Sequence, residues 1–263
     1  MSDGIRLGRA FSKGHPALVA YAMAGYPDRA RSLDALRALV RAGADLIELG
    51  VPYTDQLADG PVIVDASSAA REAAGGRFGL AESLELLREF RASGEAEVPV
   101  AIMCYLNPFM SMGLVRVADA MVEAGADGVI VPDMPPESAV PWLHASRGRL
   151  DTVFLTAPTS TPERLVKVGA SSSGFVYCVS TAGITGERTE LPPELAGNVA
   201  RVKANTSLPV VVGFGVSTPE QAASVARIAD GVVVGSALVR RQHDIEELET
   251  HCAALARAVH AAG

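Results

Sequence analysis

The sequence predicts an α/β fold, a single (β/α)8 TIM barrel with an extra N-terminal helix, with residues 1–263 forming one domain. Three observations predict this fold. Short apolar runs recur eight times, amphipathic segments lie between them, and most of the runs are apolar throughout rather than alternating. Continuous apolar runs are typical of parallel strands that are buried on both faces. Eight such units in about 250 residues is the number found in this barrel.

The predicted strands are the apolar runs Leu18–Ala24, Leu46–Val51, Val98–Leu106, Gly128–Pro132, Thr152–Ala157, Gly174–Val179, Pro209–Phe214 and Gly231–Gly235. The clearest predicted helices are rich in Ala and carry Arg and Glu on one side. They are Asp28–Ala42, Leu80–Ser93, Leu114–Ala124, Pro219–Ala226 and Ile245–Val259. Strands and helices therefore alternate along the chain, as parallel strands joined by helical crossovers require.

Local signals mark where several helices begin and end. Residues 160–163 and 217–220 each offer a capping hydroxyl, then Pro, then an acid near the positive end of the helix dipole. The repeated AGAD at 42–45 and 124–127 places Gly just after a helix. A doubly wound open sheet is disfavoured because the first run ends in Ala24–Pro27 without a GxGxxG turn. No low-complexity linker divides the chain, which favours one domain.

The composition excludes several classes of function. The formal net charge is −7, only three lysines are present, and no Lys or Arg cluster appears, so nucleic acid and anionic membrane are not expected partners. Any bound phosphate is expected to rest on backbone N–H groups. The three cysteines lie far apart and predict buried, reduced thiols. Without 18 consecutive apolar residues or a cleavable leader, we expect a soluble, cytoplasmic protein.

In this fold the active site is built at the mouth, the end of the barrel where the carboxyl ends of the strands lie. The lysines precede the first strand or fall in helical segments, so a Schiff-base lysine is not expected at the mouth. The five histidines likewise precede the first strand or fall in predicted helices, so no catalytic metal is expected. Neither a GxSxG elbow nor a Cys–His pair is present. Acid–base chemistry by carboxylates remains.

The loop after the second strand is the densest in reactive side chains. Glu48 lies inside the strand-like LIELG, where a carboxylate is costly without a partner or a purpose. Either it pairs with an Arg or Lys inside the barrel, or its pKa is raised for proton transfer. Asp55 and Asp59 lie on the loop itself, where an Asp can also simply form a turn.

Two glycine-bearing turns indicate an anion site. Residues 212–217 end the seventh strand and residues 234–237 end the eighth, and phosphate sites in this fold often use these two loops. Glycine lets the backbone approach a ligand closely, and N–H groups at a helix start attract phosphate. A third polar loop, 180–188, follows the sixth strand and is either a lid or merely a flexible loop.

The run ELGVPYTDQLADGP, residues 48–61, resembles the signature of the tryptophan synthase alpha subunit family. Further segments match that family in its order along nearly the whole chain. They are AGYP (24–27), CYLNP (104–108), VPDMPPE (131–137), STAGITG (180–186), GFGVS (213–217) and GSALV (235–239). The resemblance implies a lyase of L-tryptophan biosynthesis that reversibly cleaves indole-3-glycerol phosphate, by a retro-aldol reaction, to indole and glyceraldehyde 3-phosphate.

The resemblance also implies roles for individual residues. Glu48 matches the family's catalytic acid, Asp59 its second carboxylate and Tyr177 its active-site tyrosine. Thr185 matches the lid threonine that helps to position the Asp59 loop. The phosphate-binding positions fall on Gly186, Gly215, Gly235 and Ser236, and the apolar slot for the indole is expected to include Tyr21, Met103 and Phe214.

The resemblance further implies a separate beta subunit as partner, in an alpha2beta2 heterotetramer. Pyridoxal phosphate is expected only in that partner, and this chain is expected to hold no cofactor or metal. The loop Pro52–Asp59 is the expected partner-facing segment, with Pro52 and Asp55 in the interface. The chain departs from the family pattern at Gln56, where proline is usual, at Met23, where threonine is common, and at the variable Thr181.

Two alternatives remain open at this point. The chain could be a free-standing indole-3-glycerol phosphate lyase that releases indole without a beta partner. It could also be a non-catalytic barrel that only activates or scaffolds a partner, although the presence of both Glu48 and Asp59 counts against that role.

Overall fold

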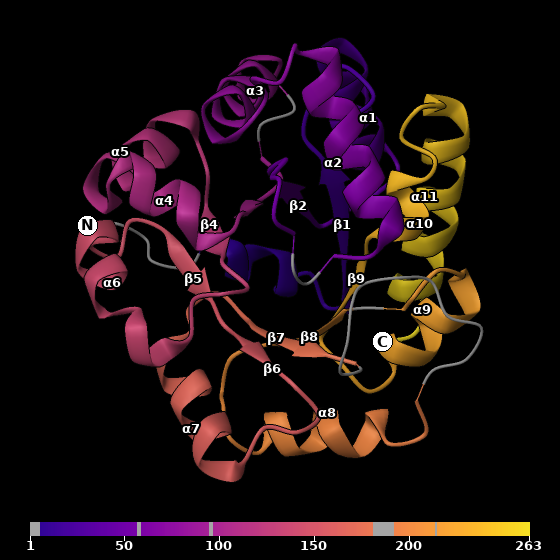
Figure 1. The fold of residues 1–263 in the computed structure, drawn as a ribbon. Coiled ribbons are helices and arrows are strands. Elements are labelled where there is room, and N and C mark those ends of the chain that lie inside the picture. The colour runs from indigo at the N-terminus through magenta and orange to yellow at the C-terminus, as the bar shows by residue number, and fades with distance from the viewer. Residues whose placement is uncertain (1–5, 57–58, 95–96, 181–191, 214) are drawn as a thin grey trace.

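The computed structural model describes the chain except for residues 1–5, 57–58, 95–96, 181–191 and 214. The described strands form one parallel sheet in the order β5-β4-β3-β2-β1-β9-β8-β7-β6. Their bounds are β1 Ala17–Met23, β2 Leu46–Gly50, β3 Val100–Met103, β4 Gly128–Ile130, β5 Asp151–Val153, β6 Leu155–Thr156, β7 Val176–Val179, β8 Val210–Gly213 and β9 Gly231–Val234. Figure 1 shows these strands as a ring, which is the predicted barrel.

The ring closes through one continuous stretch of chain. The predicted strand Thr152–Ala157 is found as two short strands, β5 and β6, which occupy the two ends of the sheet order and are separated only by Phe154. Val153 pairs with Ile130 of β4, whereas Leu155 pairs with Tyr177 of β7. The single predicted strand therefore pairs first with β4 and then with β7. For this reason the eight predicted strands correspond to nine observed ones.

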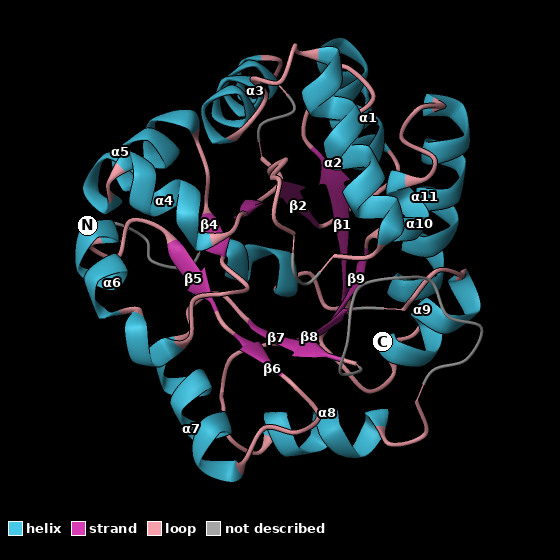
Figure 2. Ribbon diagram, in the orientation of Figure 1, coloured by secondary structure: helices cyan, strands magenta, loops and turns pink. Residues whose placement is uncertain are grey.

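Helices surround the ring of strands (Figure 2). Their bounds are α1 Arg29–Arg41, α2 Pro61–Ala73, α3 Leu80–Ala92, α4 Leu106–Met112, α5 Leu114–Ala124, α6 Val140–Ser146, α7 Pro162–Ser171, α8 Leu195–Lys203, α9 Pro219–Ala226, α10 Ser236–Val239 and α11 Ile245–His260. The five helices predicted above are confirmed to within about one residue at each end. The third predicted strand was too long, because Leu106 begins α4 instead of extending β3.

The predicted helix boundaries have the expected physical causes. The side chains of Thr161 and Thr218 cap α7 and α9, each followed by Pro in the first turn. Gly125 ends α5 with φ of +83°, the left-handed conformation that favours glycine after a helix. The prediction that His243 lies in a helix was wrong, because it lies in the turn between α10 and α11.

Buried side chains form two layers, as alternation along β1 illustrates. Ala17, Val19, Tyr21 and Met23 belong to the cluster inside the barrel. Leu18, Ala20 and Ala22 point the other way, into the larger cluster between the sheet and the helices. Both faces of every strand are thus covered, which explains why the strands read as continuous apolar runs. No helix in the described part of the chain is long and apolar enough to cross a membrane.

The N-terminal 3₁₀ helix η1 (Leu7–Phe11) closes the end of the barrel opposite the mouth. The Leu7 amide donates to the Asp151 carboxylate at the start of β5, 3.0 Å away. Leu7 also packs so closely on Gly128 and Gly174 that a β-carbon on either glycine would lie within 3.0 Å of it. This is the predicted extra N-terminal helix, and it leaves the mouth as the accessible end of the barrel.

Candidate active site

Glu48 lies in the middle of β2, next to Tyr21 of β1 on one side and Ala101 of β3 on the other. Its side chain is 1% exposed, and its Oε2 atom has no hydrogen-bond partner within the described residues. Burial, and secondarily the nearby charge of Asp59, raises the pKa of Glu48 from 4.5 to about 8. The sequence left two interpretations of Glu48 open. The described residues show no ion pair between Glu48 and Arg or Lys, and the raised pKa supports a neutral carboxylic acid.

Asp59 is held by two donors on a single oxygen. The Tyr105 hydroxyl donates to Oδ2 at 2.9 Å, and the Gln56 amide nitrogen donates to the same atom at 3.2 Å. Burial raises the pKa of Asp59, while these two hydrogen bonds act in the opposite direction because they stabilise the carboxylate. The charged form of Asp59 is therefore stabilised by two hydrogen bonds, whereas the Oε2 atom of Glu48 has none within the described residues.

Two tyrosines, Tyr21 and Tyr177, lie near the carboxylates inside the barrel. Each ring occupies space that is free only because a neighbouring strand carries glycine there. A β-carbon on Gly50 would lie 2.0 Å from the Tyr21 hydroxyl oxygen. A β-carbon on Gly213 would lie 2.2 Å from the Tyr177 hydroxyl oxygen. Burial, together with the negative charges of Glu48 and Asp59, raises the pKa of both phenols well above 10. Both hydroxyls therefore stay protonated and can donate hydrogen bonds.

The glycine turns lie at the same end of the barrel as the carboxylates. Gly215, after β8, has φ of +86°, which a side chain would oppose, and Gly235 precedes the short helix α10. A β-carbon on Gly235 would lie 3.8 Å from Cβ of Tyr21. Since the Tyr21 hydroxyl lies over Gly50 on β2, this one side chain connects the Gly235 turn with the strand that carries Glu48.

Comparisons with known proteins identify the family of this chain. A family model described as tryptophan synthase alpha chain matches residues 7–262. The chain belongs to the tryptophan synthase alpha chain family. A tryptophan synthase alpha chain from Pelobacter propionicus is 47% identical over 235 residues, covering 88% of this chain and 86% of the relative.

Solved structures of the same family superpose closely. A chain from the structure of Mycobacterium tuberculosis tryptophan synthase is 41% identical, with a TM-score of 0.89 and coverage of 97% of this chain and 98% of that one. The tryptophan synthase subunit alpha from Legionella pneumophila is 33% identical, with a TM-score of 0.87 and coverage of 97% and 98%. The family and the barrel predicted from the sequence are thereby confirmed.

Most of the predicted site residues of this alpha chain are described. Met103 ends β3 with 9% exposure, and Ser236 begins α10 with 7% exposure. The predicted interface residues differ, since Asp55 is exposed and Pro52 is buried, so only Asp55 presents its side chain outward. Three predicted positions lie outside the described residues, namely Thr185, Gly186 and Phe214, as does the departure Thr181.

Three polar residues near the mouth were not predicted as part of the site. Tyr105 lies in the quoted CYLNP segment, and its ring stacks on Tyr53 with 5.6 Å between centroids. Gln56 was noted only as a departure from proline. Gln242 is 1% exposed, accepts from the Met23 amide at 3.0 Å and donates to the carbonyls of Met23 and Tyr26 at 2.7 and 2.8 Å. It fixes the turn that follows Tyr21 and β1.

Metal-binding side chains do not gather at the described part of the mouth. Among the described residues, one group of His, Cys, Asp and Glu side chains has a spacing suited to a metal, formed by His15, Asp45 and His260. His15 precedes β1, Asp45 precedes β2 and His260 ends α11, so this group lies at the N-terminal ends of the strands, away from Glu48.

Proposed function

We propose that this chain catalyses the alpha reaction of tryptophan synthase, the reversible retro-aldol cleavage of indole-3-glycerol phosphate to indole and glyceraldehyde 3-phosphate. The observation that carries the proposal is the buried Glu48, whose pKa is raised to about 8 beside the hydrogen-bonded Asp59. A carboxyl group that stays protonated near neutral pH can serve as a general acid. Membership of the alpha chain family supports the choice of substrate.

In the proposed mechanism Glu48 delivers its proton to indole C3. The bond between C3 and the glycerol side chain then breaks, and the electrons of the adjacent C–O–H group form the aldehyde as its hydroxyl proton leaves. Having given up its proton, Glu48 is the carboxylate to which we assign that second proton. One side chain thus serves as acid and then as base, so that protons balance over the reaction.

Asp59 is assigned to the indole nitrogen. Positive charge develops on the ring when C3 is protonated, and a carboxylate that accepts the ring N–H stabilises that charge. Tyr105 and Gln56 both donate to Oδ2, so they hold the carboxylate in place. The rings of Tyr21 and Tyr177, with Met103, form the apolar wall against which we place the indole.

The phosphate is assigned to the turns that contain Gly215 and Gly235, beside Ser236. Backbone N–H groups at such turns bind phosphate without lysine, in keeping with a chain whose three lysines pair with Asp or Glu elsewhere. We assign no cofactor to this chain.

For assembly we propose an alpha2beta2 complex with a beta subunit that holds pyridoxal phosphate, in which the loop 52–59 with its exposed Asp55 faces the partner. The alternative is a free-standing lyase that releases indole. Isothermal titration calorimetry against a cognate beta subunit and the stimulation of either activity distinguish the two. Tight binding and mutual stimulation support the complex, whereas full turnover by the isolated chain without binding supports the alternative.

The decisive test of the reaction is Glu48→Gln, with Glu85→Gln as a matched control, because Glu85 lies exposed on the outer helix α3. General acid–base catalysis contributes roughly 10²–10⁴-fold. We expect kcat for indole-3-glycerol phosphate cleavage to fall by at least that factor in Glu48→Gln, with substrate affinity kept, and to be unchanged in the control. An active Glu48→Gln enzyme would exclude Glu48 as the acid, whereas absence of cleavage by the unaltered chain, with and without the beta subunit, would favour the scaffold role.

A further inference from the structure

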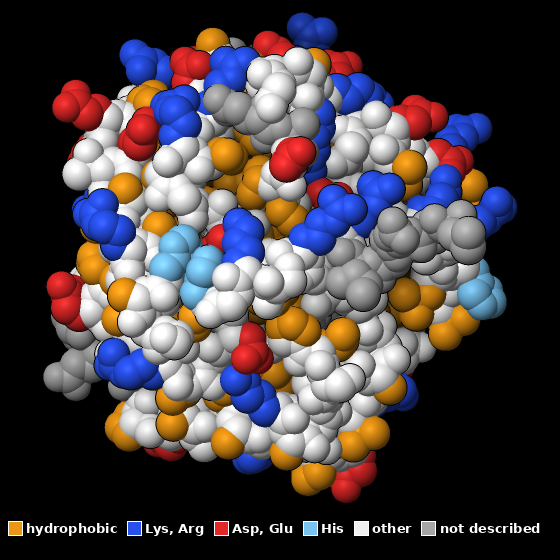
Figure 3. All heavy atoms as spheres, turned by 180° about the vertical axis from the view of Figure 1, so that it is seen from behind, with side chains coloured by type: hydrophobic (Ala, Val, Ile, Leu, Met, Phe, Trp, Pro, Cys, Tyr) orange, Lys and Arg blue, Asp and Glu red, His pale blue; other side chains and the backbone are white. Residues whose placement is uncertain are grey.

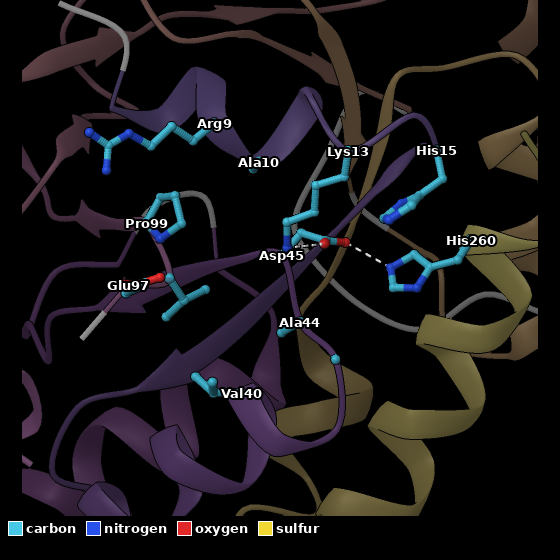
Figure 4. A pocket seen from close by; sticks show the side chains of 12 residues that line it. Arg9, Ala10, Lys13, His15, Val40, Ala44, Asp45, Glu97, Pro99 and His260 are labelled. Atoms are coloured by element: carbon cyan, nitrogen blue, oxygen red, sulfur yellow. Dashed lines mark hydrogen bonds and ion pairs between the residues drawn. The ribbon is translucent and has the colours of Figure 1, made fainter. Parts of the chain in front are cut away.

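A second polar cluster lies at the end of the barrel opposite the mouth. A cavity of about 420 Å³ opens there between the segment that follows η1, the turn before β2 and the last turn of α11. Lys13, His15, Asp45 and His260 line it. Figure 4 shows the side chains of Lys13 and His260 meeting at Asp45, with His15 beside His260. On the face seen in Figure 3, two histidine side chains lie next to each other beside a basic side chain.

Three of these residues have the geometry of metal ligands. One ligand atom from each of His15, Asp45 and His260 lies within 4.8 Å of the other two. Nε2 of His260 lies 2.8 Å from Oδ2 of Asp45, and the two imidazole rings lie 4.0 Å apart between centroids. Around Zn²⁺, ligand distances of about 2.0–2.2 Å place neighbouring ligand atoms roughly 3.3 Å apart. The separation between Asp45 and His260 is shorter than that value, and the separations to His15 are at most 4.8 Å, so the side chains would adjust when a metal binds.

Two of the three ligands, His15 and Asp45, are already oriented by neighbouring backbone groups. Nδ1 of His15 lies 3.0 Å from the Pro16 carbonyl oxygen, so a proton on Nδ1 would be used in that contact and would leave Nε2 with a lone pair for a metal. The Leu18 amide donates to Oδ2 of Asp45 at 2.9 Å and fixes the carboxylate, which is buried. In many metal sites, hydrogen bonds of this kind to the ligating side chains hold the ligands in position.

Lys13 competes for the same carboxylate. Its ammonium group lies 2.8 Å from Oδ1 of Asp45, but the lysine side chain is 50% exposed whereas that of Asp45 is 2% exposed. The ammonium can therefore move into water without leaving a buried charge of its own, and Asp45 is neutralised by Lys13 when no metal is bound. A divalent ion would replace this single positive charge.

We propose that His15, Asp45 and His260 form a binding site for a divalent transition metal of the Zn²⁺ type. Two imidazole nitrogens and one carboxylate oxygen suit that class of ion, with water completing four-coordination. The metal would join the segment before β1 to the last residue of α11, two parts of the chain 245 positions apart. The site lies away from Glu48, at the end of the barrel associated with stability. The role of the metal is therefore to hold these two parts of the chain together rather than to take part in the reaction.

The test is a Co²⁺ titration of the purified full-length chain, prepared metal-free and without a histidine tag, followed by visible absorption and by Zn²⁺ competition. We expect one saturable site per chain with a tetrahedral Co²⁺ spectrum. His15→Gln and His260→Gln each remove one of three ligands and should weaken binding by at least the roughly 10- to 100-fold that follows loss of an orienting partner. Lys13→Met should tighten it, because the competing ammonium is removed. The matched control is His144→Gln on the exposed surface of α6, which should change nothing.

Thermal unfolding provides a second readout that does not depend on the spectrum. Zn²⁺ should raise Tm of the unaltered chain and of the His144→Gln control, and should raise Tm of His260→Gln less at the same Zn²⁺ concentration. Far-UV circular dichroism checks that each variant is folded. The proposal is overturned if no saturable site appears, or if folded His15→Gln and His260→Gln bind as tightly as the control. A Lys13→Met chain with unaltered affinity overturns the competition for Asp45.

Discussion

Glu48→Gln should make the stability of the folded chain less sensitive to pH. In the folded protein the pKa of Glu48 is about 8, whereas an unfolded glutamate titrates near 4.5. Between these values the unfolded chain is ionised at this position and the folded chain is not. A raised folded pKa contributes stability that is fully present below pH 4.5 and is lost as the pH rises through 8. Glutamine does not titrate and removes this dependence.

The magnitude follows from the same two values. Each unit of pH within that window should lower the stability of the wild type relative to Glu48→Gln by about 1.4 kcal/mol. Over the whole window, the difference between 4.5 and about 8 corresponds to about 5 kcal/mol. The assay is reversible urea unfolding of both proteins at three pH values inside the window, about 5.5, 6.5 and 7.5. A stability difference that stays constant within about 0.5 kcal/mol over that range would refute a buried neutral Glu48.

Three further predictions concern the mouth. The rate of cleavage under saturating substrate should fall as the pH rises past about 8, because Glu48 must be protonated to donate, and a pH–rate profile checks this. Tyr105→Phe should raise the pKa of Asp59 and lower kcat/KM by about tenfold, because it removes a hydrogen bond to a charged group worth about 1.5–3 kcal/mol. Equal kcat/KM in mutant and wild type would contradict this. Gly213→Ala should lower the free energy of unfolding in urea by about 1–3 kcal/mol and displace the Tyr177 ring, because the added methyl would lie 2.2 Å from the Tyr177 hydroxyl oxygen. An unchanged free energy of unfolding would show that the ring can move freely.

Much of the fold could be predicted because its causes are local. The strands are short and apolar throughout, since the inner cluster and the outer helices cover both faces, and the caps at Thr161 and Thr218 use residues adjacent in sequence. The division of Thr152–Ala157 into β5 and β6 could not be predicted. It depends on which neighbour each residue pairs with, and that is decided by closure of the ring.

The candidate site was predictable where a residue breaks a local pattern. Glu48 is a carboxylate inside an apolar strand, and this conflict alone indicates a function. Tyr105 carries no such signal, because an aromatic residue beside a buried strand is ordinary; its role comes only from the 2.9 Å contact with Asp59, 46 positions away. His15, Asp45 and His260 likewise become a group only when the chain ends meet.

The central claim is that Glu48 is a neutral acid in a buried site. Infrared difference spectroscopy of wild type against Glu48→Gln measures this directly, because a protonated carboxyl group has its own carbonyl stretch. We predict that this band is present in the wild type at neutral pH, disappears as the pH rises past about 8, and is missing from the variant. A wild-type spectrum that shows only carboxylate bands at neutral pH would contradict the account.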